Sequence, residues 1–127
     1  MKDTSVVGKL GEDLACQYLE KRRYIVLRRN EKHAWGEIDI IARHKETKLL
    51  IFVEVKALVG AGEYRPEQHY NFDKARKTQR AAQLFAGRNP KWYDPDVGWR
   101  IDLLAVSLRK VPVTSFADCI IRHYENV

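Results

Sequence analysis

A chain of 127 residues, 45% hydrophobic and 31% charged, has the composition of a globular protein. Its length predicts a single domain over residues 1–127. No apolar run approaches the roughly 18–20 residues that a membrane span needs. Charges interrupt the apolar residues at the start of the chain, so a secretory signal is not expected either. The net charge of +6 favours a polyanionic partner such as nucleic acid, although many small domains are basic for solubility alone.

The cysteine usage bears on metal sites and on location. Cys16 and Cys119 lie far apart, and neither belongs to a CxxC pair. This pattern argues against a zinc site and against a disulfide framework. We therefore expect a cytoplasmic protein in a reducing compartment.

The apolar pattern predicts two helices and five strands. The first helix has apolar residues at helical spacing and candidate caps at Thr4 and Ser5. The strands are runs rich in β-branched and aromatic residues. In chain order, the predicted elements are a helix ending near Arg22, strands at 24–30, 36–43 and 49–58, a helix at 71–87 closed by Gly87, and strands at 99–108 and within 116–124.

This order, α-β-β-β-α-β-β, predicts an α/β fold with a central mixed sheet of about five strands flanked by two helices. Strands 36–43 and 49–58 are separated by a short polar segment, so they should form an antiparallel hairpin. Segments 58–70 and 87–98 contain glycine and proline and are expected to be loops.

The predicted hairpin contains four charged residues, namely Glu37, Asp39, Glu54 and Lys56. Side chains alternate along a strand, so Glu37 and Asp39 should share one face, with Ile38 and Ile40 on the other. The two charged residues of the second strand should share a face with Phe52. If the strands pair, both charged faces can lie on the same side of the sheet.

Such a group of carboxylates is costly, because like charges repel and half-buried charges lose hydration. A divalent cation would remove that cost, and carboxylate and carbonyl oxygens suit Mg²⁺ or Mn²⁺. The alternative is a solvated surface on which Lys56 pairs with Glu54 or Glu37. The flanking runs IIA and LLIFV favour the first interpretation, because continuous apolar strands are usually covered on both faces.

Several motifs extend this pattern into a family resemblance. Asp39, followed after a gap of fourteen residues by Glu54-Val55-Lys56, resembles the D…ExK signature of the restriction-endonuclease-like nuclease superfamily. The segments GEIDIIA and FVEVK, with a G..GE..A pattern at residues 8–15, closely resemble the YraN-like family of small, largely uncharacterised bacterial proteins in that superfamily. The resemblance runs from about residue 8 to about residue 104. Archaeal Holliday-junction resolvases look like more distant relatives.

The resemblance implies a restriction-endonuclease-like fold and a nuclease that requires Mg²⁺ or Mn²⁺. Asp39 and Glu54 would bind the metal together with the Val55 carbonyl. Lys56 would orient the attacking water and offset charge in the transition state. Glu12 would complete the set of metal ligands, and the alternative for Glu12 is an ordinary surface carboxylate of the helix.

The sequence also suggests roles for two further acidic residues. Glu37 is a candidate base or metal ligand, and the alternative is a partner for an arginine. Asp102 shares a strand face with Arg100, which predicts an ion pair within that strand.

The second helix has a basic face that could contact phosphates. The alternative is a solvated helix surface. The family usually continues the EVK motif with Thr-Arg or a similar basic pair, whereas this chain has Ala57-Leu58, so one expected cation is missing beside the site. The candidate nucleic-acid-binding residues are Lys74, Arg76, Lys77 and Arg80.

Three functions are therefore compared. The first is a metal-dependent nuclease that hydrolyses DNA, with branched or damaged DNA as a candidate substrate. The second is a nucleic-acid-binding module that keeps the nuclease fold with little or no cleavage. The third is a scaffold in which the charges are structural. Related resolvases act as pairs, so the resemblance also makes a homodimer an expectation.

Overall fold

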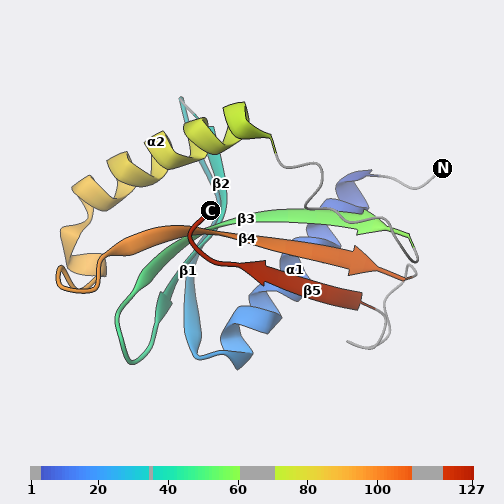
Figure 1. Cartoon of the computed structure of the whole chain (residues 1–127), viewed down its shortest axis with the longest axis horizontal. Helices are drawn as coiled ribbons and strands as arrows, with labels where there is room; N and C mark the ends of the chain where they lie inside the picture. Colours follow the sequence, from blue (N-terminus) through green and yellow to red (C-terminus); the bar gives the residue numbers. More distant parts are fainter. Residues whose placement is uncertain (1–3, 35, 61–70, 110–118) are drawn as a thin grey trace.

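The computed structural model describes residues 4–34, 36–60, 71–109 and 119–127, and Figure 1 shows how their elements are arranged. Within these residues the element order is the predicted one, with one additional 3-10 turn. The elements are α1 (Thr4–Lys21), β1 (Tyr24–His33), β2 (Gly36–His44), β3 (Leu50–Val59), α2 (Phe72–Arg88), η2 (Pro90–Trp92), β4 (Trp99–Leu108) and β5 (Cys119–Tyr124).

The described strands form one mixed sheet in the order β1-β2-β3-β4-β5. Strands β3 and β4 are parallel, and the other neighbouring pairs are antiparallel. The predicted β2–β3 hairpin is therefore confirmed. A parallel pair needs a long crossover connection, and α2 lies in the connection between β3 and β4.

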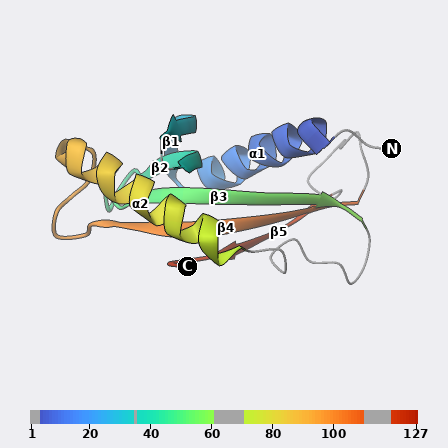
Figure 2. The ribbon, with the colours of Figure 1, turned by 90° about the horizontal axis from the view of Figure 1, so that it is seen from above.

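The two helices pack on opposite faces of the sheet. Ala15 and Leu19 of α1 pack with Val53, whereas Ala82 and Phe85 of α2 pack in a second cluster with Phe52. Figure 2 shows α1 to one side of β3 and β4. Residues 50–53 of β3 are fully buried, so the prediction that this apolar run is covered on both faces is confirmed.

Some element ends differ from the predicted ones. Strand β1 continues to His33, three residues beyond the predicted end. Helix α1 begins at Thr4, so Thr4 and Ser5 lie inside the helix instead of capping it. Helix α2 is capped by the Asn71 side chain, which accepts hydrogen bonds from the backbone N–H groups of residues 73 and 74.

The prediction that Gly87 closes α2 is wrong, because the helix continues through it to Arg88. The end is set by Pro90, since a proline disfavours helical backbone in the residue before it. Accordingly, Asn89 has φ −131° and ψ 57°, and its side-chain amide donates to the Phe85 carbonyl.

The predicted loop at 58–70 begins later than expected, because β3 extends to Val59. Most of the remaining segment, residues 61–70, lies outside the described residues. None of the helices in the described part of the chain combines the length and apolar character needed to cross a membrane.

Candidate active site

The site begins where β2 separates from β3. The pairing of these strands ends at Ile40 opposite Val53, whereas β2 stays paired with β1 as far as Gly36. At this point an Asp39 carboxylate oxygen accepts a 2.8 Å hydrogen bond from the Val55 N–H. The carboxylate thus takes the place of a strand partner. The N–H and C=O groups of one strand residue point to the same side, so the Val55 carbonyl also faces this opening.

The predicted alternation of β2 is wrong at Asp39. Ile38 packs in the cluster beneath α2, whereas Ile40 packs in the cluster beneath α1. Strict alternation would have placed both isoleucines on one face. Opposite Asp39 in β1 lies Asn30, which has a left-handed φ of 52°, so the strand pair is distorted there. The distortion directs Asp39 towards β3, while Glu37 is exposed near α2.

Glu54 and Lys56 share the α2 face of β3 with Phe52, as predicted. Glu54 is only 4% exposed, and its Oε1 atom lies 2.7 Å from the Lys74 ammonium and 3.7 Å from the Lys56 ammonium. A buried carboxylate needs such partners to remain charged. The structure therefore brings Lys74, a candidate for nucleic-acid binding, into the carboxylate site.

Glu12 lies on α1, which packs very close to β3 at the neighbouring Gly11. An added Cβ at Gly11 would lie 2.4 Å from the Ala57 Cβ, so only glycine allows this approach. The Glu12 side chain is 17% exposed and lies 3.6 Å from the Arg29 guanidinium. Arg29 also forms a 2.8 Å ion pair with Asp13. Arg29 lies in a predicted strand, but no local pattern in the sequence indicated that it would pair with Glu12 and Asp13.

Gly11→Ala is expected to lower the free energy of unfolding by up to about 2 kcal/mol. Overpacking against Ala57 costs about 1–3 kcal/mol, and the better helix propensity of alanine offsets about 1 kcal/mol of this. Gly8→Ala is the matched control, because a Cβ there meets no described atom within 4 Å. Urea unfolding should show the control unchanged or more stable. Equal effects at both positions would contradict the close packing of α1 on β3.

The electrostatics of the site centre on Asp39. Its pKa is raised to about 7, chiefly by burial and in smaller part by the charges of Glu54 and Glu12, while the Val55 hydrogen bond and the charge of Lys74 act to lower it. The pKa of Lys74 is raised; burial acts to lower it, but the hydrogen bond and charge of Glu54 outweigh that effect. Lys74 thus offsets part of the negative charge at Asp39 and Glu54.

The donor chemistry of this site fits a hard divalent cation. Asp39, Glu54 and the Val55 carbonyl offer oxygen donors, which Mg²⁺ and Mn²⁺ prefer. The pKa of Asp39 is raised chiefly by burial, and a bound cation would favour its ionised form. Among the described residues, however, no three His, Cys, Asp or Glu side chains are grouped so that they could hold a metal ion together. Glu54 instead forms an ion pair with the Lys74 ammonium group.

The other basic residues of α2 do not form one face. Lys77 and Arg80 line a cleft of about 690 Å³ together with Lys32, Gly36 and Glu37. At Gly36 the strand passes so close to α2 that an added Cβ would lie 3.2 Å from the Lys77 carbonyl oxygen. This close approach forms the wall between the cleft and the sheet.

Arg76 lies apart from that cleft. It forms an ion pair with Asp73 and lines a different hollow of about 450 Å³ beside Phe72 and Ile101. Of the four basic residues predicted to contact phosphates, the structure therefore places Lys77 and Arg80 together, Lys74 at Glu54, and Arg76 elsewhere.

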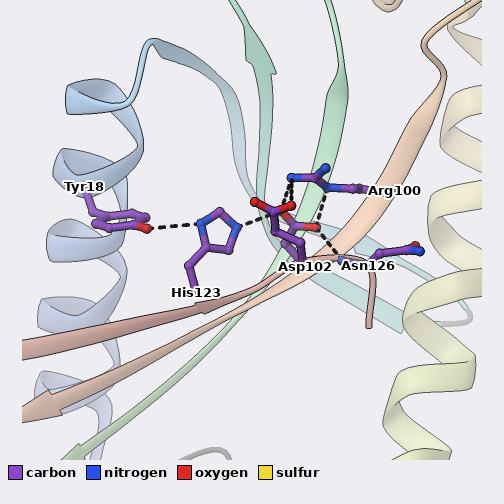
Figure 3. A network of polar contacts seen from close by, with 6 residues as sticks. Tyr18, Arg100, Asp102, His123 and Asn126 are labelled. Carbon is purple, nitrogen blue, oxygen red and sulfur yellow. Dashed lines mark hydrogen bonds and ion pairs between the residues drawn. The ribbon is translucent and has the colours of Figure 1, made fainter.

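A separate polar network lies on the α1 face (Figure 3). Asp102 is fully buried, and Arg100 donates to both of its oxygens at 2.9 and 3.3 Å, so the predicted ion pair is confirmed. The Asn126 backbone N–H donates to Asp102 Oδ1 at 3.0 Å, and His123 Nε2 lies 2.8 Å from Asp102 Oδ2. The Tyr18 hydroxyl lies 3.2 Å from His123 Nδ1. This network ties α1, β4, β5 and the C-terminal residues together.

Comparisons with known proteins agree with the motifs. A family model described as "Uncharacterised protein family UPF0102" matches residues 11–106. A UPF0102 protein of Caldanaerobacter subterraneus is 38% identical over 109 residues, which cover 85% of this chain and 84% of that protein. A UPF0102 protein of Dictyoglomus turgidum is 36% identical over 102 residues, covering 80% and 82%. Another, of Thermotoga neapolitana, is 45% identical over 78 residues, covering 61% and 68%. The chain therefore belongs to the UPF0102 family, the family of the YraN-like proteins that its motifs resemble.

Proposed function

We propose that this protein is a metal-dependent nuclease that hydrolyses phosphodiester bonds of DNA. The observation that carries the proposal is the convergence of Asp39 and Glu54 where β2 separates from β3. The Val55 N–H orients Asp39, and Lys56 lies beside Glu54. Two carboxylates and an ammonium at an open strand edge are groups suited to phosphodiester hydrolysis with Mg²⁺ or Mn²⁺.

Each residue has a role in this proposal. Asp39, Glu54 and the Val55 carbonyl would hold the divalent cation, which lowers the pKa of a water and polarises a phosphoryl oxygen. Lys56 supplies positive charge that stabilises the additional negative charge of the transition state. The charge of Glu12 contributes to raising the pKa of Asp39, so we infer that Glu12 adds negative charge near the site.

The basic cleft supports nucleic acid as the substrate class. Lys77 lies one helical turn after Lys74, and Glu37 lies two residues before Asp39, so the cleft adjoins the carboxylate site along both elements. Lys77 and Arg80 can neutralise phosphates, which provides affinity without selecting a base sequence. Glu37 is the acidic residue of this cleft. Because it lies in the cleft, we do not assign it as a metal ligand.

Removing the two cleft cations is expected to weaken DNA binding. In EDTA, the double variant Lys77→Ala/Arg80→Ala should bind duplex DNA about 10- to 100-fold more weakly at 0.1 M salt. The negative slope of log K against log salt should become shallower by about 2. The matched control is Lys45→Ala with Lys91→Ala, because both lysines are exposed and lie outside the cleft. An equal loss in the control would show that net charge, and not the cleft, determines binding.

A cleavage assay tests the function itself. The wild-type protein is incubated with labelled branched, single-stranded and duplex DNA in Mn²⁺, in Mg²⁺ and in EDTA, and Mn²⁺ binding is measured by calorimetry. Cleavage that needs the metal, with Mn²⁺ binding, is the expected result. Failure to bind Mn²⁺ with DNA present would overturn the proposed metal site.

A nucleic-acid-binding module with little cleavage is the second candidate, and two observations favour it. Leu58 stands where the family usually has a basic residue, so the α2 face of β3 lacks one cation. In addition, the Lys74 ammonium occupies Glu54. Mn²⁺-independent DNA binding through the cleft, without cleavage of any substrate, would support this function over the nuclease.

A further inference from the structure

Lys74 has a position that its helix alone would not favour. It is the third residue of α2, and the positive end of the helix dipole disfavours an ammonium group in the first turn. The Asn71 cap accepts hydrogen bonds from the backbone N–H groups of Asp73 and Lys74, so the start of the helix is fixed. The Lys74 side chain is nevertheless directed at the buried carboxylate of Glu54, at 2.7 Å.

Among the residues that the structure describes, Lys74 is the nearest cation to Glu54. The Lys56 ammonium lies 3.7 Å from the same Oε1 atom, an ångström further than that of Lys74. A charge as buried as Glu54 requires a close partner, because losing one member of such a pair leaves an uncompensated ion. The Lys74 side chain is 47% exposed, so its flexible stem can turn away towards solvent.

We propose that Lys74 is an internal counter-ion that holds Glu54 when no metal is bound and is displaced from it when a divalent cation binds. The ammonium and the cation compete for one carboxylate oxygen, so Lys74 lowers the affinity of the site for metal. This inference rests on the proposed function, because it needs Glu54 to be a metal ligand. In addition, Lys74 would set the concentration of free metal ion at which the site becomes occupied.

Competition of this kind has a predictable size. If Lys74 occupies Glu54 in about nine molecules out of ten, the apparent Kd for metal is raised about tenfold. Lys74→Met keeps the length of the side chain and removes its charge. We therefore expect Lys74→Met to bind Mn²⁺ about tenfold more tightly than wild type, by calorimetry without nucleic acid. Lys45→Met is the matched control, exposed in the turn between β2 and β3, and should bind as wild type does.

Thermal unfolding provides an independent readout. Without metal, Lys74→Met should unfold at a lower temperature than wild type, because Glu54 loses its closest partner. At the same excess concentration, Mn²⁺ should raise the Tm of Lys74→Met more than that of wild type, because stabilisation of the folded state by a ligand grows with the logarithm of its concentration divided by Kd. If Lys74→Met does not fold, Lys74→Arg serves instead; it keeps the charge and should bind Mn²⁺ no more tightly than wild type.

The outcomes separate this inference from the proposed function. Tighter binding by Lys74→Met, with wild-type binding by Lys45→Met, supports the counter-ion. If wild type binds Mn²⁺ and Lys74→Met binds it equally well or more weakly, the counter-ion role is overturned and the metal site remains. Tighter binding by Lys74→Arg than by wild type would have the same meaning. If neither wild type nor Lys74→Met binds Mn²⁺, with DNA present as well as without it, both the inference and the metal site are overturned.

Discussion

Asp39→Asn is expected to reduce Mn²⁺-dependent DNA cleavage by about 100-fold or more. Asparagine has nearly the shape of aspartate, and its side-chain oxygen can still accept the hydrogen bond from the Val55 N–H. The change therefore removes the negative charge that a cation needs while keeping the local geometry. Mn²⁺ binding by calorimetry should be weakened in parallel, since one of two carboxylate donors is lost.

The same substitution should not destabilise the metal-free protein at pH 8. The pKa of Asp39 is raised to about 7 in the folded state, above the ordinary aspartate value of 3.8. The folded state therefore binds the proton more tightly, and the contribution of Asp39 to stability falls as the pH rises from about 4 to about 7. Above that window the ionised carboxylate is a cost, which asparagine removes. Urea unfolding at pH 8 should show Asp39→Asn to be at least as stable as wild type.

These opposite effects separate a functional role from a structural one. Asp96→Asn is the matched control, because Asp96 is exposed in the turn before β4. It should leave both cleavage and stability unchanged. An Asp39→Asn protein that is clearly less stable than wild type at pH 8 would identify Asp39 as a structural residue of the strand junction and weaken its assignment as a metal ligand.

Strand β3 illustrates what local sequence can determine. Its continuous apolar run indicates burial on both faces, and alternation correctly places Glu54 and Lys56 with Phe52. These properties depend only on the strand period and on hydrophobicity. Identifying the hairpin and the mixed sheet needed little more than the order and spacing of the elements.

Strand β2 shows where local reasoning stops. Alternation fails at Asp39 because β2 leaves β3 there while remaining paired with β1, and because Asn30 adopts a left-handed conformation opposite it. Both are consequences of the tertiary pairing. The only signal in the sequence is a charged residue within an apolar strand, and such a residue can mark either a surface or a break in the ladder.

Helix α2 gives a second example. A helical wheel places its basic residues on an outward face, but it does not reveal how the helix crosses the sheet. The close contact of Gly36 with the backbone at Lys77 sets that crossing. As a result Lys74 reaches Glu54, while Lys77 and Arg80 line the cleft. Which cation belongs to which site therefore depends on packing that no single element encodes.

Asp102→Asn is expected to lower the free energy of unfolding by about 3 kcal/mol at pH 7. Asp102 is fully buried and accepts hydrogen bonds from Arg100 and from the Asn126 backbone, with His123 Nε2 at 2.8 Å. An amide cannot satisfy all of these donors, and it leaves the Arg100 guanidinium without its closest counter-charge. Urea unfolding measures the loss, with Asp96→Asn as the exposed control.

The dependence of this loss on pH distinguishes charge from shape. Burial alone would raise the pKa of Asp102, but the hydrogen bonds from His123, Arg100 and the Asn126 N–H outweigh it and hold the pKa below its usual range. A carboxyl group with a lowered pKa stabilises the fold above its unfolded pKa of about 4, and this contribution disappears as the pH falls through the folded value. The difference between wild type and Asp102→Asn should therefore be constant from pH 5 to 7 and shrink below about pH 4. A difference that persists unchanged at pH 3 would mean that the network depends on the shape of the Asp102 side chain and not on its charge. A contribution from charge must fall once the pH is low enough to protonate Asp102 in the unfolded state.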